Sequence, residues 1–178
     1  MVNAWQLISS RIALTDRWIT VRADVCQRDD GVLIDPYYVF ERQDWVCILP
    51  ITGDGDVIQT VEYRHGIGSV VVGLPGGVVE STDVSPQAAA ARELLEETGY
   101  SCEHLVPLGA LYANWANQTN LIHYFLGVDA HLVAEQCLDS HEQIELLRKP
   151  WSEVQSTQLL RQSYHVACVH LAQSYMQR

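Results

Sequence analysis

The stretch LPGGVVESTDVSPQAAAARELLEETGY, residues 74–100, is the part of the chain that best indicates its fold. Ser85 followed by Pro86 is typical of an N-cap with proline at the first helical position. Gly99 is a favourable residue for ending a helix, because glycine readily adopts the left-handed conformation. The stretch therefore predicts a helix from about Pro86 to Thr98.

Three carboxylates, those of Glu93, Glu96 and Glu97, lie on one patch of this predicted helix. Residues three and four apart are helix neighbours, so the like charges repel, and the macrodipole also disfavours anions near a helix C-terminus. Arg92 can pair with Glu96, but one guanidinium cannot neutralise three acids. A solvated acidic face is one interpretation. A bound divalent cation is the other, because Mg²⁺ binds carboxylate oxygens together with water and phosphates.

The surroundings of the acids favour the cation. The other side of the predicted helix is small and apolar at Ala88, Ala91 and Leu95, with Leu94 nearby, so we expect it to pack on a sheet while the acids face outward. Gly76 and Gly77, in front of the helix, allow the backbone to approach a group bound over the acids.

The rest of the chain predicts strands before the helix, and strands followed by helices after it. β-branched or alternating runs indicate strands at residues 18–25, 37–40, 45–49, 57–61, 70–74, 121–126 and 144–147. The continuous run at 70–74 suits a strand that is buried on both faces. We expect an acidic loop at 129–142 and closing helices at 152–161 and 164–176. This order predicts a mixed α/β sandwich.

Composition and charge exclude several classes of function. The 178 residues include 22 acidic and 11 basic side chains, a formal charge of −11, and no basic run suited to nucleic acid or an anionic membrane. The longest apolar run, Trp45–Ile51, is too short to span a bilayer, and the N-terminus lacks the apolar core of a signal peptide. We expect a cytoplasmic protein whose five cysteines are reduced thiols.

The motif residues resemble the signature of the Nudix hydrolases. That signature reads Gly, five residues, Glu, seven residues, Arg-Glu-aliphatic-x-Glu-Glu-x-Gly-aliphatic. Arg92–Gly99 matches its second half at every position, with Tyr100 in the last place. Counting from Gly77, Asp83 replaces the first glutamate, and eight residues separate it from the arginine. We interpret the difference as a one-residue insertion before the helix that leaves the helical spacing intact.

The resemblance implies an α/β fold, a Nudix-type α/β/α sandwich with a mixed sheet, over residues 44–178. Residues 1–43 precede it as an antiparallel β segment. This segment is similar to the one with which related enzymes pair two subunits, and two-fold dimers are the commonest assembly. We therefore expect a homodimer in which residues 1–43 are the dimerisation element.

Further segments look like the ADP-ribose and nucleoside-diphosphate-sugar pyrophosphatases within this superfamily. They are Glu62–Gly66, Leu74–Gly77, Leu108–Tyr112 and Asn117–His123. The resemblance implies hydrolysis of the pyrophosphate bond in ADP-ribose or a nucleotide sugar, which yields two monophosphates. The alternative is a catalytically silent module that binds a nucleotide and regulates a partner.

Three residues are candidates for binding the substrate: Arg64, Asn120 and Trp115. In the branch, an arginine at the position of Arg64 contacts phosphate, a role that suits its forked guanidinium; the alternative is a surface charge at a strand end. The Trp115 ring could stack on a base or support a loop. Trp115 and Ala113 stand where the branch commonly carries prolines.

The resemblance also assigns the metal ligands. Glu93, Glu96 and Glu97, with the carbonyl of Gly76, would hold one to three Mg²⁺ ions, which Mn²⁺ could replace. Glu93 and Glu97 would thereby act in catalysis. Arg92 would brace the carboxylates, or would form a plain helix ion pair.

The general base in this branch is a glutamate on a late loop, which matches residues 139–145 here. Glu142 is our choice and Glu145 the second; either could instead be a solvated loop acid. Between the two functions, the intact set of Arg92 with three mutually repelling carboxylates favours the enzyme, because a binding module has no need to retain them.

Overall fold

The computed structural model describes residues 2–156 and 160–177, and the chain divides into two compact units. One unit contains the residues up to Gln43 together with Tyr112–Leu121, and the other contains Asp44–Leu111 and the residues from Ile122 onward. Within the described residues, no helix is long and apolar enough to cross a membrane.

The first unit is built on a three-stranded antiparallel sheet. Its order is β1 (Gln6–Thr15), β2 (Thr20–Gln27), β3 (Leu33–Glu41), so the middle strand pairs with both others. Every residue of β1 is exposed, whereas Asp24 of β2 is buried and accepts hydrogen bonds from Ser10 and Arg22. The segment Tyr112–Leu121 joins this unit through a bridge between Phe40 and Gln118.

The second unit contains the larger sheet. Its strands are β4 (Trp45–Thr52), β5 (Asp56–Arg64), β6 (Ser69–Gly73), β7 (Tyr100–Ser101), β8 (His104–Tyr112), β9 (Leu121–Leu132) and β10 (Ile144–Pro150). The order is β10-β5-β4-β9-β7, while β6 pairs with β5 and β8 pairs with β9. The sheet is mixed because β4 and β9 are parallel, whereas β5 is antiparallel to each of its neighbours.

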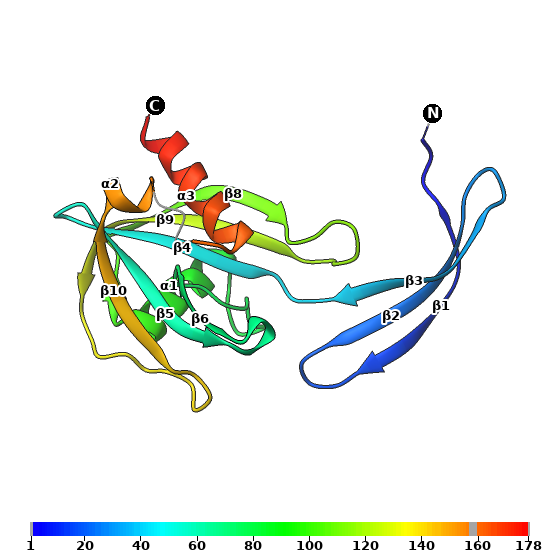
Figure 1. Ribbon diagram of the computed structural model, residues 1–178, viewed down its shortest axis with the longest axis horizontal. Coiled ribbons are helices and arrows are strands. Elements are labelled where there is room, and N and C mark those ends of the chain that lie inside the picture. Colours follow the sequence, from blue (N-terminus) through cyan, green and yellow to red (C-terminus); the bar gives the residue numbers. More distant parts are fainter. Residues whose placement is uncertain (1, 157–159, 178) are drawn as a thin grey trace. The chain divides into compact units, whose positions relative to one another are not determined.

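Four helical segments accompany the sheets: the 3₁₀ turn η1 (His65–Ile67) and the helices α1 (Pro86–Thr98), α2 (Trp151–Val154) and α3 (Ser163–Met176). Both longer helices pack against β4 (Figure 1). Val46 and Ile48 form a core with α1 and with Phe125 of β9. Cys47 lies between them in the strand, and its carbonyl accepts a hydrogen bond from the thiol of Cys168 in α3. Alternate residues of β4 thus serve the two helices, as the predicted sandwich requires.

The sheet splits beside β5 (Figure 1). Near its start β5 pairs with β4 at Val57, but from Thr60 to Arg64 the same edge pairs with β6 instead. Where β5 leaves β4, the β4 amides donate their hydrogen bonds to the glycine-rich turn after β6. The amide of Val46 donates to the Gly77 carbonyl at 2.8 Å, and that of Ile48 donates to Pro75 at 2.9 Å. This turn lies over the C-terminal half of α1.

The predicted bounds of α1 are confirmed, including both caps. The Ser85 hydroxyl accepts from the Ala88 amide at 3.1 Å, and Gly99, at φ 72°, donates to the Leu95 carbonyl at 2.8 Å.

The predicted packing face of this helix is wrong. Ala89, Ala90 and Leu94 are the buried apolar residues, whereas Ala91 is exposed and Leu95 is 40% exposed. With about 3.6 residues per turn, the buried residues centre on nearly the opposite side of the helix from Ala88, Ala91 and Leu95, and the buried face includes Glu97.

Other sequence predictions also need correction. The run at residues 70–74 is an edge strand with Val70 67% exposed, because β6 has a neighbour on one side only. The helix expected at 152–161 is the short α2, which ends at Val154; residues 157–159 of that prediction lie outside the described part. The strand expected at 121–126 continues to Leu132, into the predicted acidic loop. The antiparallel β segment expected at 1–43 is confirmed, although no separate strand was assigned at β1; strands β7 and β8 were not predicted.

Candidate functional site

Arg92 forms hydrogen bonds both to the loop before α1 and to acidic residues of that helix. Its Nη1 donates to Glu93 at 3.0 Å and to Glu96 at 2.9 Å. Its Nε and Nη2 donate to Asp83 at 3.2 Å and 3.0 Å, and Nη2 also donates to the Val78 carbonyl at 3.0 Å. Arg92 thus fixes the loop before α1 and two of the three helix glutamates in one geometry.

Asp83 therefore has a defined position despite the inserted residue. The bonds from Arg92 hold the pKa of Asp83 below its ordinary value. The other bond of this carboxylate comes from the Glu80 amide at 2.9 Å. The shorter acid anchors the loop, and the insertion is taken up before the helix begins.

Glu97 lies in the packed interface of α1 and not on a solvated patch. Its side chain is buried, and Oε2 accepts a hydrogen bond from the Gly76 amide at 2.9 Å. Burial raises the pKa of Glu97 to about 8, and the charges of Glu93, Glu62 and Glu142 add to the rise. The sequence expectation that all three acids face outward is thus wrong for this residue.

The Glu93 carboxylate lies directly against Gly77. A Cβ added at Gly77 would lie 2.4 Å from Glu93 Oε1, so a side chain there would displace the carboxylate. Burial raises the pKa of Glu93 to about 7, which the charge and hydrogen bond of Arg92 oppose. At Gly76, φ is 157° and a Cβ would lie 2.2 Å from the Val46 carbonyl. Both glycines are therefore needed for the close approach that the sequence predicted.

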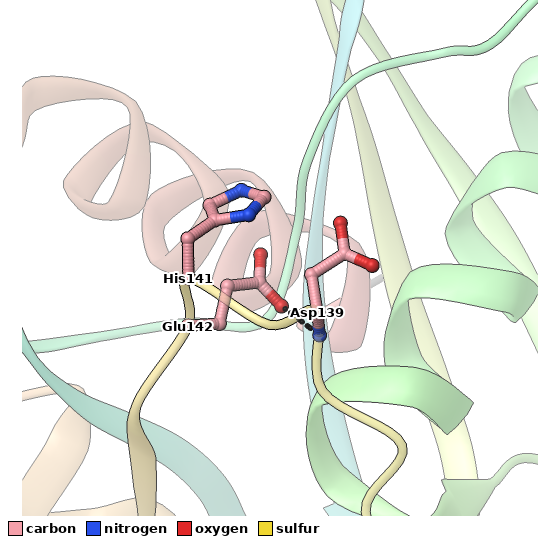
Figure 2. A group of neighbouring side chains, drawn as sticks. All are labelled: Asp139, His141 and Glu142. Carbon is pink, nitrogen blue, oxygen red and sulfur yellow. Dashed lines mark hydrogen bonds between the residues drawn. The ribbon is translucent and has the colours of Figure 1, made fainter.

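The late loop between β9 and β10 carries a second acidic group (Figure 2). Asp139, His141 and Glu142 are exposed, and one ligand atom from each lies within 4.8 Å of the others. Among the described residues this is the group of three that meets such a spacing. Glu142 Oε2 accepts from the Asp139 amide at 3.1 Å, which fixes one end of the loop. The charge of Glu142 reaches Glu62, Glu93 and Glu97.

Strand β5 contributes two further charged residues. Arg64 Nη2 pairs with Glu62 Oε1 at 2.6 Å; the arginine side chain is 53% exposed and the glutamate side chain 14%. Burial raises the pKa of Glu62, Arg64 opposes the rise, and Glu142 adds to it. Glu62 was not among the predicted site residues. Its spacing of two from Arg64, directly after the strand predicted at 57–61, was the available signal, because residues two apart on a strand share a face.

The remaining candidates are placed separately. Glu145 is opposite Val61 in the pairing of β10 with β5, while its neighbour Ile144 is opposite Glu62. Since successive strand residues point to opposite faces, Glu145 lies on the other face of the sheet from Glu62. Asn120 and Trp115 belong to the unit that contains β1–β3. Trp115 is 87% exposed. The side-chain amide of Asn120 is buried without a hydrogen-bond partner among the described residues.

The acids around the glycine turn fit a hard divalent cation. Their charges act on one another, and those with raised pKa values are Glu62, Glu93 and Glu97. Buried carboxylates of this kind are costly when ionised unless a positive charge lies close. Oxygen donors of this type are the ligands that Mg²⁺ and Mn²⁺ prefer.

Comparisons with known proteins support the same interpretation. A model of the NUDIX domain matches residues 41–166, and a model of the nucleoside diphosphate sugar hydrolase N-terminal domain matches residues 5–40. The ADP-ribose pyrophosphatase of Bacillus subtilis is 30% identical over 103 residues, which cover 57% of this chain and 55% of that protein. The chain thus spans about half the length of this relative.

Two further relatives match a larger share of the chain. The GDP-mannose pyrophosphatase of Cronobacter sakazakii is 26% identical over 160 residues, which are 83% of this chain and 82% of that protein. The crystal structure of an ADP compounds hydrolase has a TM-score of 0.87 at 21% identity and covers 99% of this chain and 96% of its own. At that identity the likeness shows a shared fold.

Proposed function

The chain belongs to the Nudix family, and from this premise we propose that it hydrolyses the pyrophosphate bond of ADP-ribose or a nucleotide sugar with Mg²⁺. The observation that carries the proposal is the desolvated pair Glu93 and Glu97 beneath Gly76-Gly77. Their pKa values of about 7 and about 8 are raised by desolvation, and the charge of Arg92 offsets that rise only in part at Glu93. A nucleotide-binding module has no need of such a pair.

Each charged residue then has a role. Glu93, Glu96 and Glu97 with the Gly76 carbonyl would hold Mg²⁺ or Mn²⁺, which offsets phosphate charge and lowers the pKa of a bound water. Arg92 holds Glu93 and Glu96 in place through its two hydrogen bonds.

Two residues would act on the substrate itself. Arg64 would bind a phosphate oxygen of the diphosphate. Glu142 would accept a proton from the attacking water. The opposite orientation of Glu145 on β10 supports the choice of Glu142.

The substrate class rests on relatives. The names ADP-ribose pyrophosphatase and GDP-mannose pyrophosphatase belong to proteins that are 30% and 26% identical to this chain. Both enzymes act on a nucleoside diphosphate linked to a sugar, so hydrolysis here would give a nucleoside monophosphate and a sugar phosphate.

A substrate panel tests the activity. The purified protein would be incubated with Mg²⁺ and ADP-ribose, GDP-mannose, a dinucleotide or a nucleoside triphosphate, and products separated by chromatography. We expect turnover of the first two and its loss in Glu97→Gln. Nucleotide binding without turnover of any substrate would instead support a silent regulatory module.

We also propose that the protein is a homodimer of the cytoplasm. On β1, exposed apolar residues form an edge that another chain can cover, including Leu7, Ile12 and Leu14. The first unit buries few residues of its own, so association would stabilise it. The five cysteines of the whole chain are free thiols, which suits a reducing compartment. Light scattering should give twice the 20.0 kDa chain mass; a particle of that single mass would remove the dimer.

A further inference from the structure

The two residues that lie opposite Glu62 on the neighbouring strands are apolar. Across β5, Glu62 is opposite Ile144 of β10 on one side and Val71 of β6 on the other. Neither of these side chains can donate or accept a hydrogen bond, and Ile144 is buried. A carboxylate in such a position needs a positive partner.

The other charges that reach Glu62 are mostly of the same sign. Glu142 and Glu97 both interact with it unfavourably. Arg64 is the cation that pairs with it, with Nη2 at 2.6 Å from Oε1. Since Thr60, Glu62 and Arg64 alternate on one face of β5, the ion pair runs along the strand.

The pair determines where the arginine head lies. Arg64 is the last residue of β5, and its side chain is 53% exposed, so an unpaired guanidinium there would sample many rotamers in water. The bond to Glu62 draws the guanidinium toward the acids. Its charge is also felt by Tyr164 and His165 at the start of α3. The guanidinium has five donors, so the pair leaves others to face a phosphate.

We infer that Glu62 is a positioning residue that holds the Arg64 guanidinium for the diphosphate. The inference rests on the proposed function and goes beyond it, because Glu62 itself touches no substrate. Losing it would leave the metal-binding acids in place and would remove the preorganisation of the arginine, so substrate binding would weaken more than the chemical step.

A double-mutant cycle tests the inference. Wild type, Glu62→Ala, Arg64→Ala and the double variant would be compared for kcat and KM with ADP-ribose and for the Kd of ADP with Mg²⁺ by calorimetry. We expect Arg64→Ala and Glu62→Ala each to raise KM about tenfold, the loss typical of one charged hydrogen bond, with kcat nearly unchanged. The double variant should be no worse than Arg64→Ala alone.

Two more variants separate positioning from general damage. Glu62→Gln keeps an oxygen that can accept from Arg64, so it should recover most of the loss. Asp56→Ala removes the pairing of Asp56 with Arg148, at 2.6 Å at the other end of the same strand; it should leave KM unchanged. Effects of Glu62→Ala and Arg64→Ala that multiply in the double variant, or a fall in kcat at constant KM, overturn the inference.

Failure of the proposed function is distinguishable from failure of the inference. If wild type hydrolyses nothing but binds ADP, the activity is wrong, and the same cycle read in Kd still decides the role of Glu62. If wild type hydrolyses neither ADP-ribose nor GDP-mannose and binds neither ADP nor GDP, both proposals are overturned.

Discussion

Two acidic groups of this protein differ in how the chain holds them. On the late loop, Asp139, His141 and Glu142 bring their ligand atoms within 4.8 Å in full exposure. On α1, Glu93 and Glu97 are desolvated beneath two glycines and have pKa values of about 7 and about 8. Water already stabilises the loop group, whereas the helix group gains far more from a cation. We therefore propose that the metal binds the helix group, where desolvation and not the spacing of ligand atoms is the indicator.

Removing the most buried acid should have the largest effect. Glu97→Gln keeps the shape of the side chain and removes its negative charge, so metal binding should weaken and kcat/KM should fall about 10³-fold or more. Steady-state turnover of ADP-ribose over a range of Mg²⁺ concentrations measures this. Activity within tenfold of wild type would place the metal elsewhere.

Glu142 belongs to the loop group, but we expect it to act as the general base at the site that the helix group forms. We expect Glu142→Gln to lower kcat by about 10²- to 10⁴-fold, the usual contribution of a general base. The Mg²⁺ affinity from calorimetry should stay nearly unchanged, because a general base would contact the attacking water and not the metal. An unaffected rate would remove Glu142 from the chemistry.

Gly77→Ala tests the cover over the helix group. The added Cβ would meet Glu93 Oε1 at 2.4 Å, the flexible end of a side chain, so the carboxylate should move while the fold survives. We expect kcat/KM to fall about 10- to 100-fold, as small displacements of a catalytic group commonly cause. Thermal unfolding serves as the control, and a large drop in Tm would assign the loss to misfolding.

The pH dependence of stability should also separate the groups. The pKa of Glu97 is raised from 4.5 to about 8, so folding favours its protonated form. That stabilisation is fully present below about pH 4.5 and is lost as the pH rises through 8. In chelator, the free energy of unfolding should therefore fall by roughly 2–4 kcal/mol between pH 5 and 8.

Urea unfolding of wild type, Glu97→Gln and Asp139→Asn measures this slope. Glu97→Gln should make the slope shallower and leave the part that the raised pKa of Glu93 contributes, whereas Asp139→Asn should leave the slope as in wild type. Mg²⁺ should raise stability most at pH 8. A slope as steep in Glu97→Gln as in wild type would assign the pH dependence to other groups.

Asp139→Asn should have the smallest effect. Asp139 is an exposed acid that water already solvates well. The affinity of the protein for Mg²⁺ should therefore change less than about twofold. Calorimetric titration checks this, and a tenfold loss of affinity would show that the loop group holds metal after all.

Local signals carried much of the prediction. Ser85, Pro86 and Gly99 fix both ends of α1, because capping depends on residues within one turn. The error in its packing face came from Glu97, which apolar periodicity assigns to solvent. Only the glycine turn after β6, far from the helix in sequence, explains why this acid is buried.

Contacts between distant segments were beyond the sequence. The charges of Glu62 and Glu142 act on the helix acids because one edge of β5 pairs with β10 while its other edge changes from β4 to β6, and no local pattern encodes that pairing. Strand β1 was missed because its ten residues are all exposed and carry no burial pattern to detect.

The split in the sheet also provides a spectroscopic handle. The Val46 and Ile48 amides donate to the carbonyls of Gly77 and Pro75 and not to another strand. Their hydrogen exchange therefore follows the opening of the turn over the acids, whereas exchange in the parallel pairing of β4 with β9 follows unfolding of the sheet. Two protons in the middle of the sheet thus act as reporters of whether the turn over Glu93 and Glu97 keeps its hydrogen bonds to β4.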